Sequence, residues 1–426
     1  MKFFLFFYLL ANSYISTASD APNPVQRQST VPLLIIPGQK NSNNIRSSMT
    51  PRTRGKTFAT MGRASSNLRQ EIQETKDCRI EFPHTPLPER HSVRNLRNFF
   101  EPQQTESSEE VWELEDKKYL VEKLPFAAGG EKQVFKAIQK GQPFVIAVYH
   151  SPAQKDEKSF YAKFIPISNE TKLRLALPTR ANPYKHPKTG RETYVMRKYR
   201  GDLFSLEQLP TEEKIIKQLA PSLAAMHTEG FIHRDIKPDN IFMGKKELYL
   251  GDFGSVTKIK EGEEFPSNIH NTPEYSPPEW FLLEEIQLLS NGQRNPTRLK
   301  KLKKILSDLY DKLKEDLNLQ TNEEAYKALE ESMDFYRLGK SAFIAAMPEQ
   351  ERARYLQDQR KTYLNLIETN VPSSNPSQWM GIANMLYGKR NLEKTLGLLE
   401  ADPALRLLNA RKIINDANSN GNSSPK

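Results

Sequence analysis

Two aspartates and an asparagine lie close together in the middle of the sequence, and their types suit chemistry on phosphate groups. Asp235 and Asn240 stand in FIHRDIKPDNIFM at 231–243, and Asp252 follows in GDFG at 251–254. One carboxylate of such a set can accept the proton of an attacking hydroxyl. The other carboxylate and the amide oxygen are suitable ligands for Mg²⁺ held against phosphates. The order therefore indicates phosphoryl transfer from ATP, in which positioning and charge neutralisation supply most of the rate.

The surrounding residues resemble the catalytic core of the eukaryotic-type Ser/Thr protein kinase family. HRD at 233–235 and KPDN at 237–240 match the family's catalytic loop, and DFG at 252–254 matches its metal-binding triplet. The Lys-Pro pair in this loop is similar to Ser/Thr-directed rather than Tyr-directed kinases. The resemblance implies a catalytic base at Asp235, a phosphoryl contact at Lys237, and Mg²⁺ ligands at Asn240 and Asp252.

The implied fold is α+β and two-lobed, with a small β-rich N-lobe and a larger helical C-lobe that clamp ATP between them. The implied activity is transfer of the ATP γ-phosphoryl group to Ser or Thr of a protein substrate, with ATP and Mg²⁺ as cofactors. The alternative is a pseudokinase that acts as an ATP-binding or partner-binding scaffold. The intact base and metal ligands favour the enzyme, whereas two departures from the family pattern favour the scaffold.

The first departure is a degenerate Gly-rich loop, FAAGGEKQVFKA at 126–137. Gly129 aligns with the family's second glycine, whereas Ala127 and Lys132 stand where the first and third are expected. Because Ala and Lys resist the φ > 0 conformations that glycine allows, we expect a stiffer loop. The resemblance places the remaining ATP-binding residues in this loop, the next strands and the hinge: Gly130, Val134, Ala147, Met196, Arg197, Tyr199, Asp202 and Phe242.

The second departure is the missing lysine of the third strand, where FVIAVYH places Tyr149. Tyr supplies no cation at neutral pH. Lys132 resembles the relocated lysine of the with-no-lysine kinases, and the alternative is a solvated loop lysine in an inactive relic. The predicted partner of Lys132 is Glu170, ahead of an apolar-periodic run, and Glu157 is the competing carboxylate.

Composition bounds the class of protein. The chain has 426 residues, 37% of them apolar, and a net charge of +10, which allows a two-lobed domain and a disordered portion. No nucleic-acid motif accompanies the charge, so we predict no specific nucleic-acid partner. Cys78 is the one cysteine, which excludes an intrachain disulfide and a Cys-based metal site.

The first residues, MKFFLFFYLLANSYISTASDA, follow the pattern of a secretory signal, and we predict a signal peptide at 1–18. The alternative is an uncleaved apolar start or short anchor. No later segment is apolar enough to cross a bilayer, so we expect no transmembrane segment in the mature chain. The signal pattern predicts export, whereas a single cysteine fits a protein that works in a reducing compartment. A secreted effector that is delivered into another cell would account for both features.

The rest of the chain divides by composition. Residues 19–110 are rich in Ser, Thr, Asn, Pro, Arg and Gln and predict a disordered tail, with the apolar piece Val31–Pro37 as a local contact. Residues 111–416 form the predicted kinase-like domain, and 417–426 a disordered C-terminus. Alternating apolar residues predict strands within 119–126, 130–138, 143–150 and 191–199, with a helical region at 155–177.

Residues 283–333 are longer than the family's usual connection here and predict an inserted helical subdomain. Leu299, Leu302, Leu306, Leu309, Leu313 and Leu317 recur at three- and four-residue spacing, which places them on one helical face. We expect this face to pack on the C-lobe. The alternative is a helix that docks a partner or a membrane surface, because its polar face is Lys-rich.

Further motifs resemble C-lobe anchors. Asp334 matches the residue that holds the catalytic-loop backbone, and Glu279 and Arg406 match a buried ion pair. Arg234 offers a cationic site for a phosphate on the activation segment, with Ser267 as the expected phosphorylated residue.

Overall fold

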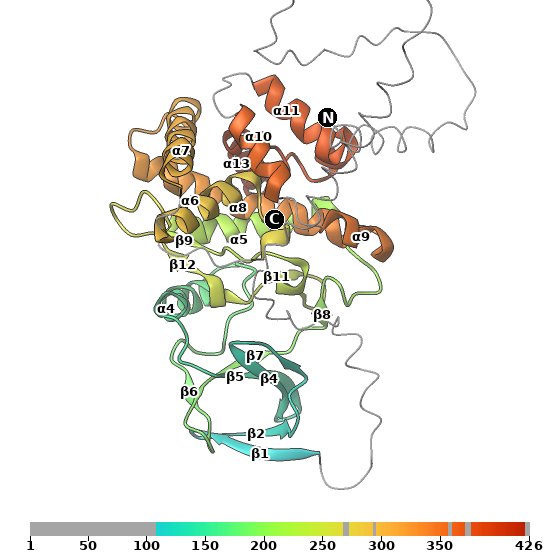
Figure 1. Cartoon of the computed structure of the whole chain (residues 1–426). Coiled ribbons are helices and arrows are strands. Elements are labelled where there is room, and N and C mark those ends of the chain that lie inside the picture. Colours follow the sequence, from blue (N-terminus) through green and yellow to red (C-terminus); the bar gives the residue numbers. More distant parts are fainter. Residues whose placement is uncertain (1–107, 267–271, 293–294, 357–359, 371–375, 422–426) are drawn as a thin grey trace, which may run out of the picture. The chain divides into compact units, whose positions relative to one another are not determined.

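The alternating apolar residues near position 110 and beyond form a curled antiparallel sheet in a computed structural model of the chain (Figure 1). The structure describes residues 108–421, except 267–271, 293–294, 357–359 and 371–375. The strand order is β1-β2-β4-β5-β7-β6, and β3 pairs with β4. The strands are β1 (Glu109–Leu114), β2 (Lys117–Glu122), β3 (Ala127–Ala128), β4 (Lys132–Gln139), β5 (Gln142–Tyr149), β6 (Tyr184–Lys185) and β7 (Glu192–Arg197).

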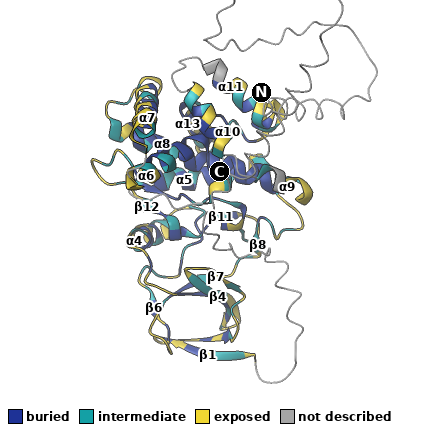
Figure 2. Cartoon of the chain, viewed as in Figure 1, coloured by how far each residue is buried: buried dark blue, intermediate teal, exposed yellow. Residues whose placement is uncertain are grey.

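One face of the sheet encloses the core of the N-lobe (Figure 2). β1 and β2 alternate between buried and exposed residues, whereas β5 ends in four buried residues. Sequence analysis placed Glu109 and Glu110 in the tail and missed β1, because acidic residues dominate EEVWEL. In β1, Trp112 and Leu114 are buried while Val111 faces outward. All six residues of β1 pair with β2, and the alternation places Trp112 and Leu114 on the buried face of the sheet.

Helix α4 (Lys155–Glu170) is shorter than the predicted helical region at 155–177. After Thr171 the chain becomes extended. Leu175 then forms a bridge to Leu250, and the Ala176 N–H donates to the Leu250 carbonyl at 2.7 Å. The apolar run at 173–177 therefore packs as extended chain, because the strand beside it offers backbone hydrogen bonds.

The C-lobe is built on three helices, α5 (Glu212–Thr228), α8 (Asn322–Ala345) and α13 (Pro403–Gly421), whose buried faces share one core. Helix α5 continues through Pro221. Short strands carry the loops of the site: β8 (Gly201–Asp202), β9 (Phe231–Ile232), β10 (Ile241–Met243), β11 (Leu248–Leu250) and β12 (Thr257–Lys258). The remaining helices are α9 (Glu349–Tyr355), α10 (Arg360–Asn370), α11 (Pro376–Tyr387) and α12 (Lys389–Lys394).

The inserted segment contributes α6 (Pro278–Gly292) and α7 (Pro296–Leu317). The central leucines of α7 are buried in a core shared with α6, α8, α10 and Trp379 of α11. Its apolar face is therefore covered by the C-lobe, as expected, whereas docking of a partner through its Lys-rich polar face stays a prediction. Because α8 begins at residue 322, the inserted helices end before the predicted boundary at 333.

The two ends of the chain fall partly outside these elements. Residues 1–107, which include the predicted signal peptide and nearly all of the predicted tail, lie outside the described residues. At the other end α13 extends to Gly421, so residues 417–421 are helical and not disordered as predicted. Among the described helices, none is both long and apolar enough to cross a membrane.

A buried ion pair joins two distant parts of the C-lobe. Arg406 Nη1 lies 2.5 Å from Glu279 Oε1, and both side chains are almost fully buried. The guanidinium also donates to the Ser332 carbonyl at 3.1 Å and to the Glu400 carbonyl at 3.0 Å. The predicted buried ion pair between Glu279 and Arg406 is therefore confirmed. Its contacts hold α6 against α8 and α13.

We predict that Arg406→Met costs about 3–5 kcal/mol of unfolding free energy, because it leaves the Glu279 charge buried without its partner. The double variant Glu279→Met with Arg406→Met should lose less, since no uncompensated charge remains. Chemical denaturation measures both. Lys389→Met, at an exposed side chain, is the control and should leave the midpoint unchanged. A double variant less stable than the single one contradicts the prediction.

Candidate active site

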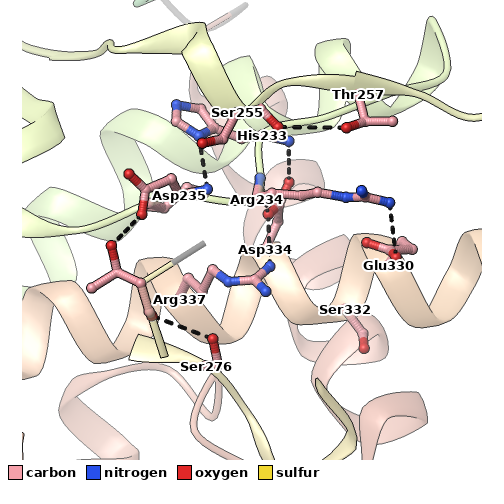
Figure 3. Close-up of polar contacts among 12 residues, drawn as sticks. His233, Arg234, Asp235, Ser255, Thr257, Ser276, Glu330, Ser332, Asp334 and Arg337 are labelled. Atoms are coloured by element: carbon pink, nitrogen blue, oxygen red, sulfur yellow. Dashed lines mark hydrogen bonds and ion pairs between the residues drawn. The ribbon is translucent and has the colours of Figure 1, made fainter. Parts of the chain in front are cut away.

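The catalytic loop is held from below by one buried carboxylate of α8 (Figure 3). Asp334 accepts the backbone N–H of His233 at 2.7 Å and that of Arg234 at 2.9 Å. Although burial alone raises the pKa of Asp334, its contacts with His227 and Arg337 lower that pKa to about 2. The carboxylate is therefore charged at neutral pH, and it holds Arg234 at a φ of 68°, a left-handed conformation that non-glycine residues rarely adopt.

His233 fixes the other side of the loop. Burial lowers the pKa of His233 below its ordinary value, so the ring is neutral at pH 7. Its Nδ1 lies 3.3 Å from the Asp235 backbone N–H and accepts from it, so Nε2 carries the proton and donates to the Gly251 carbonyl at 3.2 Å. The histidine joins the strand before DFG to the loop that carries Asp235.

Asp235 lies among three donors. Lys237 Nζ is 2.7 Å from Asp235 Oδ2, Thr272 Oγ1 donates to Asp235 Oδ1 at 2.6 Å, and Asn240 Nδ2 lies 3.1 Å from Oδ2. Burial favours the neutral acid, but Lys237 outweighs it and lowers the pKa of Asp235 below its ordinary value. The carboxylate is therefore ionised and ready to accept a proton.

Thr272 was not predicted as a site residue, because the sequence suggested only that it supports the loop that binds the substrate. It donates to Asp235, and Lys237 Nζ donates to its Oγ1 at 3.0 Å. Thr272 thus joins the activation segment to the catalytic base. Its position directly before the PEYSPPE motif was the available signal.

Asn240 and Asp252 offer oxygen atoms suited to a hard divalent cation. Asn240 Nδ2 donates to the Asp235 carbonyl at 2.8 Å, which leaves the amide oxygen Oδ1 for a metal. Asp252, at a φ of 59°, carries a carboxylate whose pKa is lowered, because Lys132 outweighs the effect of burial. No cluster of three His, Cys, Asp or Glu occurs among the described residues. Mg²⁺ commonly takes only one or two carboxylates, with phosphates and water completing its shell, so this donor set fits.

Lys132 reaches this site from β4. Its Nζ donates to Asp252 Oδ1 at 2.6 Å and lies 5.5 Å from the centre of the Tyr149 ring. Lys132 and Tyr149 are direct partners in the β4–β5 ladder. Directly opposed residues of an antiparallel pair share one face of the sheet. The ammonium thus projects from the strand next to the residue where the family carries its lysine.

The expected pairing of Lys132 with Glu170 is wrong. Glu170 is exposed at the C-terminal end of α4. Glu157, the competing carboxylate in the first turn of this helix, is buried and accepts from Tyr149 Oη at 2.6 Å. Burial works against the charge of Lys132, but Asp252, with smaller contributions from Glu157 and Glu131, raises the pKa of Lys132 above its ordinary value.

The predicted nucleotide residues occupy adjoining positions. Ala127 pairs with Val134, and Val134 pairs with Ala147, so these side chains form a row across the sheet. Met196 and Arg197 close β7. Tyr199 stacks on Phe242, with ring centres 5.7 Å apart, and Asp202 pairs with Phe242 through β8 and β10. Asp202 Oδ1 already accepts the Ser205 N–H at 2.9 Å.

The altered glycine pattern is compatible with the backbone of this loop, and its predicted stiffness stays a prediction. In the described part of the chain, none of residues 127–132 has a positive φ. Gly129 and Gly130 have no atom of another segment within 4 Å of an added Cβ. The loop conformation is therefore one that Ala127 and Lys132 can adopt without strain. An added side-chain carbon at Gly129 or Gly130 would meet no other segment.

Arg234 does not stand as an open phosphate site. Its Nη2 lies 3.1 Å from Glu330 Oε1 and 3.3 Å from Tyr326 Oη, both on α8 (Figure 3). Both charged side chains are buried. A carboxylate of the C-lobe thus already provides a negative partner for this guanidinium. Ser267 lies outside the described residues, and its phosphorylation stays a prediction.

Comparison with known proteins places the same segment in a family. The family model described as protein kinase domain matches residues 187–291. A chloroplastic Ser/Thr protein kinase of Arabidopsis thaliana, STN8, is 36% identical over 75 residues, which are 17% of this chain and 15% of the relative. A US3 homologue of Gallid herpesvirus 2, also a Ser/Thr protein kinase, is 42% identical over 79 residues, which are 17% of this chain and 20% of the relative.

The chain thus aligns with a fifth or less of the length of these two curated relatives. A crystal structure of a Stt7 homologue from Micromonas algae, soaked with ATP, aligns with a TM-score of 0.44 at 15% identity, over 74% of this chain and 96% of that one. The match at 187–291 contains the HRD, KPDN and DFG residues whose geometry is described above. Motif and match together show that residues 187–291 are similar to the protein kinase domain.

Proposed function

We propose that the chain is an active Ser/Thr protein kinase that transfers the γ-phosphoryl group of ATP to a protein hydroxyl, with Mg²⁺ as the metal. The observation that carries this proposal is the contact of 2.6 Å between Lys132 Nζ and Asp252 Oδ1. It brings a cation to the metal-binding carboxylate although the strand lysine is absent. A pseudokinase that had lost phosphate chemistry would not need this charge at this place.

The chain's own residues divide the work of the reaction. Asp235 accepts the proton of the substrate hydroxyl while Lys237, held by both Asp235 and Thr272, faces the transferred group. Asn240 and Asp252 would hold the metal ion, which neutralises the charge that develops on the phosphates. Lys132 would leave Asp252 for the phosphates, a change between two anionic partners that keeps its charge compensated.

The preference for Ser or Thr rests on the activation segment. Thr272 ties this segment to Asp235 and Lys237, which sets the substrate loop close to the catalytic base. The Lys237-Pro238 pair and the Ser/Thr kinases among the matched relatives favour the same class. The substrate is therefore proposed to be an exposed Ser or Thr of a protein.

Export of the chain is a separate proposal, based on the signal pattern at 1–18. We propose that this segment directs secretion and that the kinase acts inside another cell, where ATP is abundant. N-terminal sequencing of the exported protein should begin near Ser19. Recovery of full-length, retained protein alone would contradict it.

Asp235→Asn should abolish phosphate transfer, because the amide cannot accept the proton, while nucleotide binding is kept. Asp252→Ala should abolish transfer and also remove the Mg²⁺ dependence of nucleotide affinity. Transfer of labelled phosphate to a generic basic protein measures activity, and calorimetry measures binding. Turnover by either purified variant above contamination would refute the role assigned to the substituted residue, whereas no turnover by the parent would leave the scaffold.

Lys132→Met should lower kcat/KM on the order of a hundredfold or more, since a cation beside the transferring phosphates is worth several kcal/mol in the transition state. The matched control is Lys136→Met on the same strand, whose ammonium pairs with Glu122 at 3.2 Å and should be mild. Steady-state kinetics with ATP as the varied substrate measure both. Similar effects of the two substitutions would show that Lys132 has no special part.

A further inference from the structure

A buried carboxylate beside the candidate site is left unexplained by the chemistry above. Glu157 is 1% exposed. Among the described residues, no Lys or Arg nitrogen lies within ion-pair distance of it. A charge in such a place is costly unless hydrogen bonds compensate it. Two phenols do so: Tyr149 Oη donates at 2.6 Å and Tyr161 Oη at 2.9 Å, both to Oε1.

The two phenols come from different elements. Tyr161 lies one turn after Glu157 in α4, so its bond is internal to the helix. Tyr149 closes β5, and its bond crosses from the sheet to the helix. Phe160 of α4 packs on Phe253 of the DFG triplet, with ring centres 4.4 Å apart. A tie between β5 and α4 therefore also sets the helix that covers Phe253.

Tyr149 is at the same time the cross-strand neighbour of Lys132, whose ammonium lies over its ring. The ring is 4% exposed, and the hydrogen bond at its end fixes its orientation. Glu157 contributes to the favourable field at Lys132. The side chain of Tyr149 thus contacts both the buried carboxylate of Glu157 and the ammonium group of Lys132, which reaches Asp252.

We infer that Tyr149 is a positioning residue: its hydrogen bond to Glu157 ties α4 to β5 and holds Lys132 against Asp252. This inference deepens the proposed function and assigns Tyr149 a part in aligning the lysine. The tie acts through a hydrogen bond and not through an ion pair, so an uncharged acceptor at position 157 serves it as well.

The chain supplies a matched comparison in Tyr194 of β7. Its ring packs against both Tyr149 and Tyr161, at 5.6 and 5.1 Å, and it is equally buried. Its hydroxyl, however, has no hydrogen-bond partner among the described residues. Removing the oxygen of Tyr194 therefore tests loss of a buried phenol hydroxyl without loss of the tie.

The experiment compares Tyr149→Phe, Glu157→Gln and Tyr194→Phe in the full chain. Amide hydrogen exchange of 155–170 reports whether α4 is held, and titration with Mg·ADP reports the nucleotide site. In Tyr149→Phe we expect exchange to rise, and the Mg·ADP Kd to weaken, by about tenfold, the size of effect that the loss of one buried hydrogen bond carries. Glu157→Gln keeps an acceptor oxygen and should change both by less than about threefold. Tyr194→Phe should change neither.

Two results overturn the inference. Exchange of α4 in Tyr149→Phe that equals the parent means that the phenol only fills space. Equal losses in Tyr149→Phe and Glu157→Gln mean that the carboxylate charge, and not the hydrogen bond, holds the helix. Exchange is measured without nucleotide, so it decides the matter even if the parent binds no Mg·ADP, which would instead refute the proposed function. A drop in thermal stability alone, with unchanged exchange and Kd, counts as a structural role and against positioning.

Discussion

The buried carboxylate of Asp334 is the constraint on which the site depends. It accepts hydrogen bonds from the backbone N–H groups of both His233 and Arg234, and so fixes the backbone from which Asp235 projects. The backbone of Arg234 is left-handed there, a conformation that persists only where surrounding contacts determine it. Because Asp334 sits on the helix most deeply buried in the C-lobe, the geometry of Asp235 is set by the packing of the core.

The charges of the site form a chain between the lobes. Lys237 and Thr272 hold Asp235, Asn240 bonds back to the loop, and Lys132 reaches from the sheet to Asp252. Each carboxylate has a cation or several donors beside it, so the buried charges of the pocket are compensated. Arg234 with Glu330 adds a pair inside the C-lobe. The activation segment is thus anchored to groups that are present as soon as the chain has folded.

Much of this followed from short sequence motifs. HRD, KPDN and DFG predicted residues that the structure brings together in one site, while their roles as base and metal ligands stay predictions, and the leucine spacing of α7 predicted a buried helical face. The choice of Glu170 over Glu157 was wrong because helical periodicity was read through 171–177, which is extended chain paired with β11. That pairing is a tertiary contact, and no local pattern announces it. The sequence predicted that Lys132 replaces the lysine missing at Tyr149, but sequence order does not show that the two residues are direct partners in the β4–β5 ladder.

The register of β4 with β5 also bears on how a lysine could move between strands in evolution. Lys132 and Tyr149 are opposed residues on one face of the sheet, so a side chain from either position enters the same volume. A chain with lysine at both positions keeps a cation there throughout the exchange. A mutational route through such a chain therefore contains no step at which the charge is missing. In this fold, the absence of lysine from the β5 position does not by itself show that the site lacks a cation.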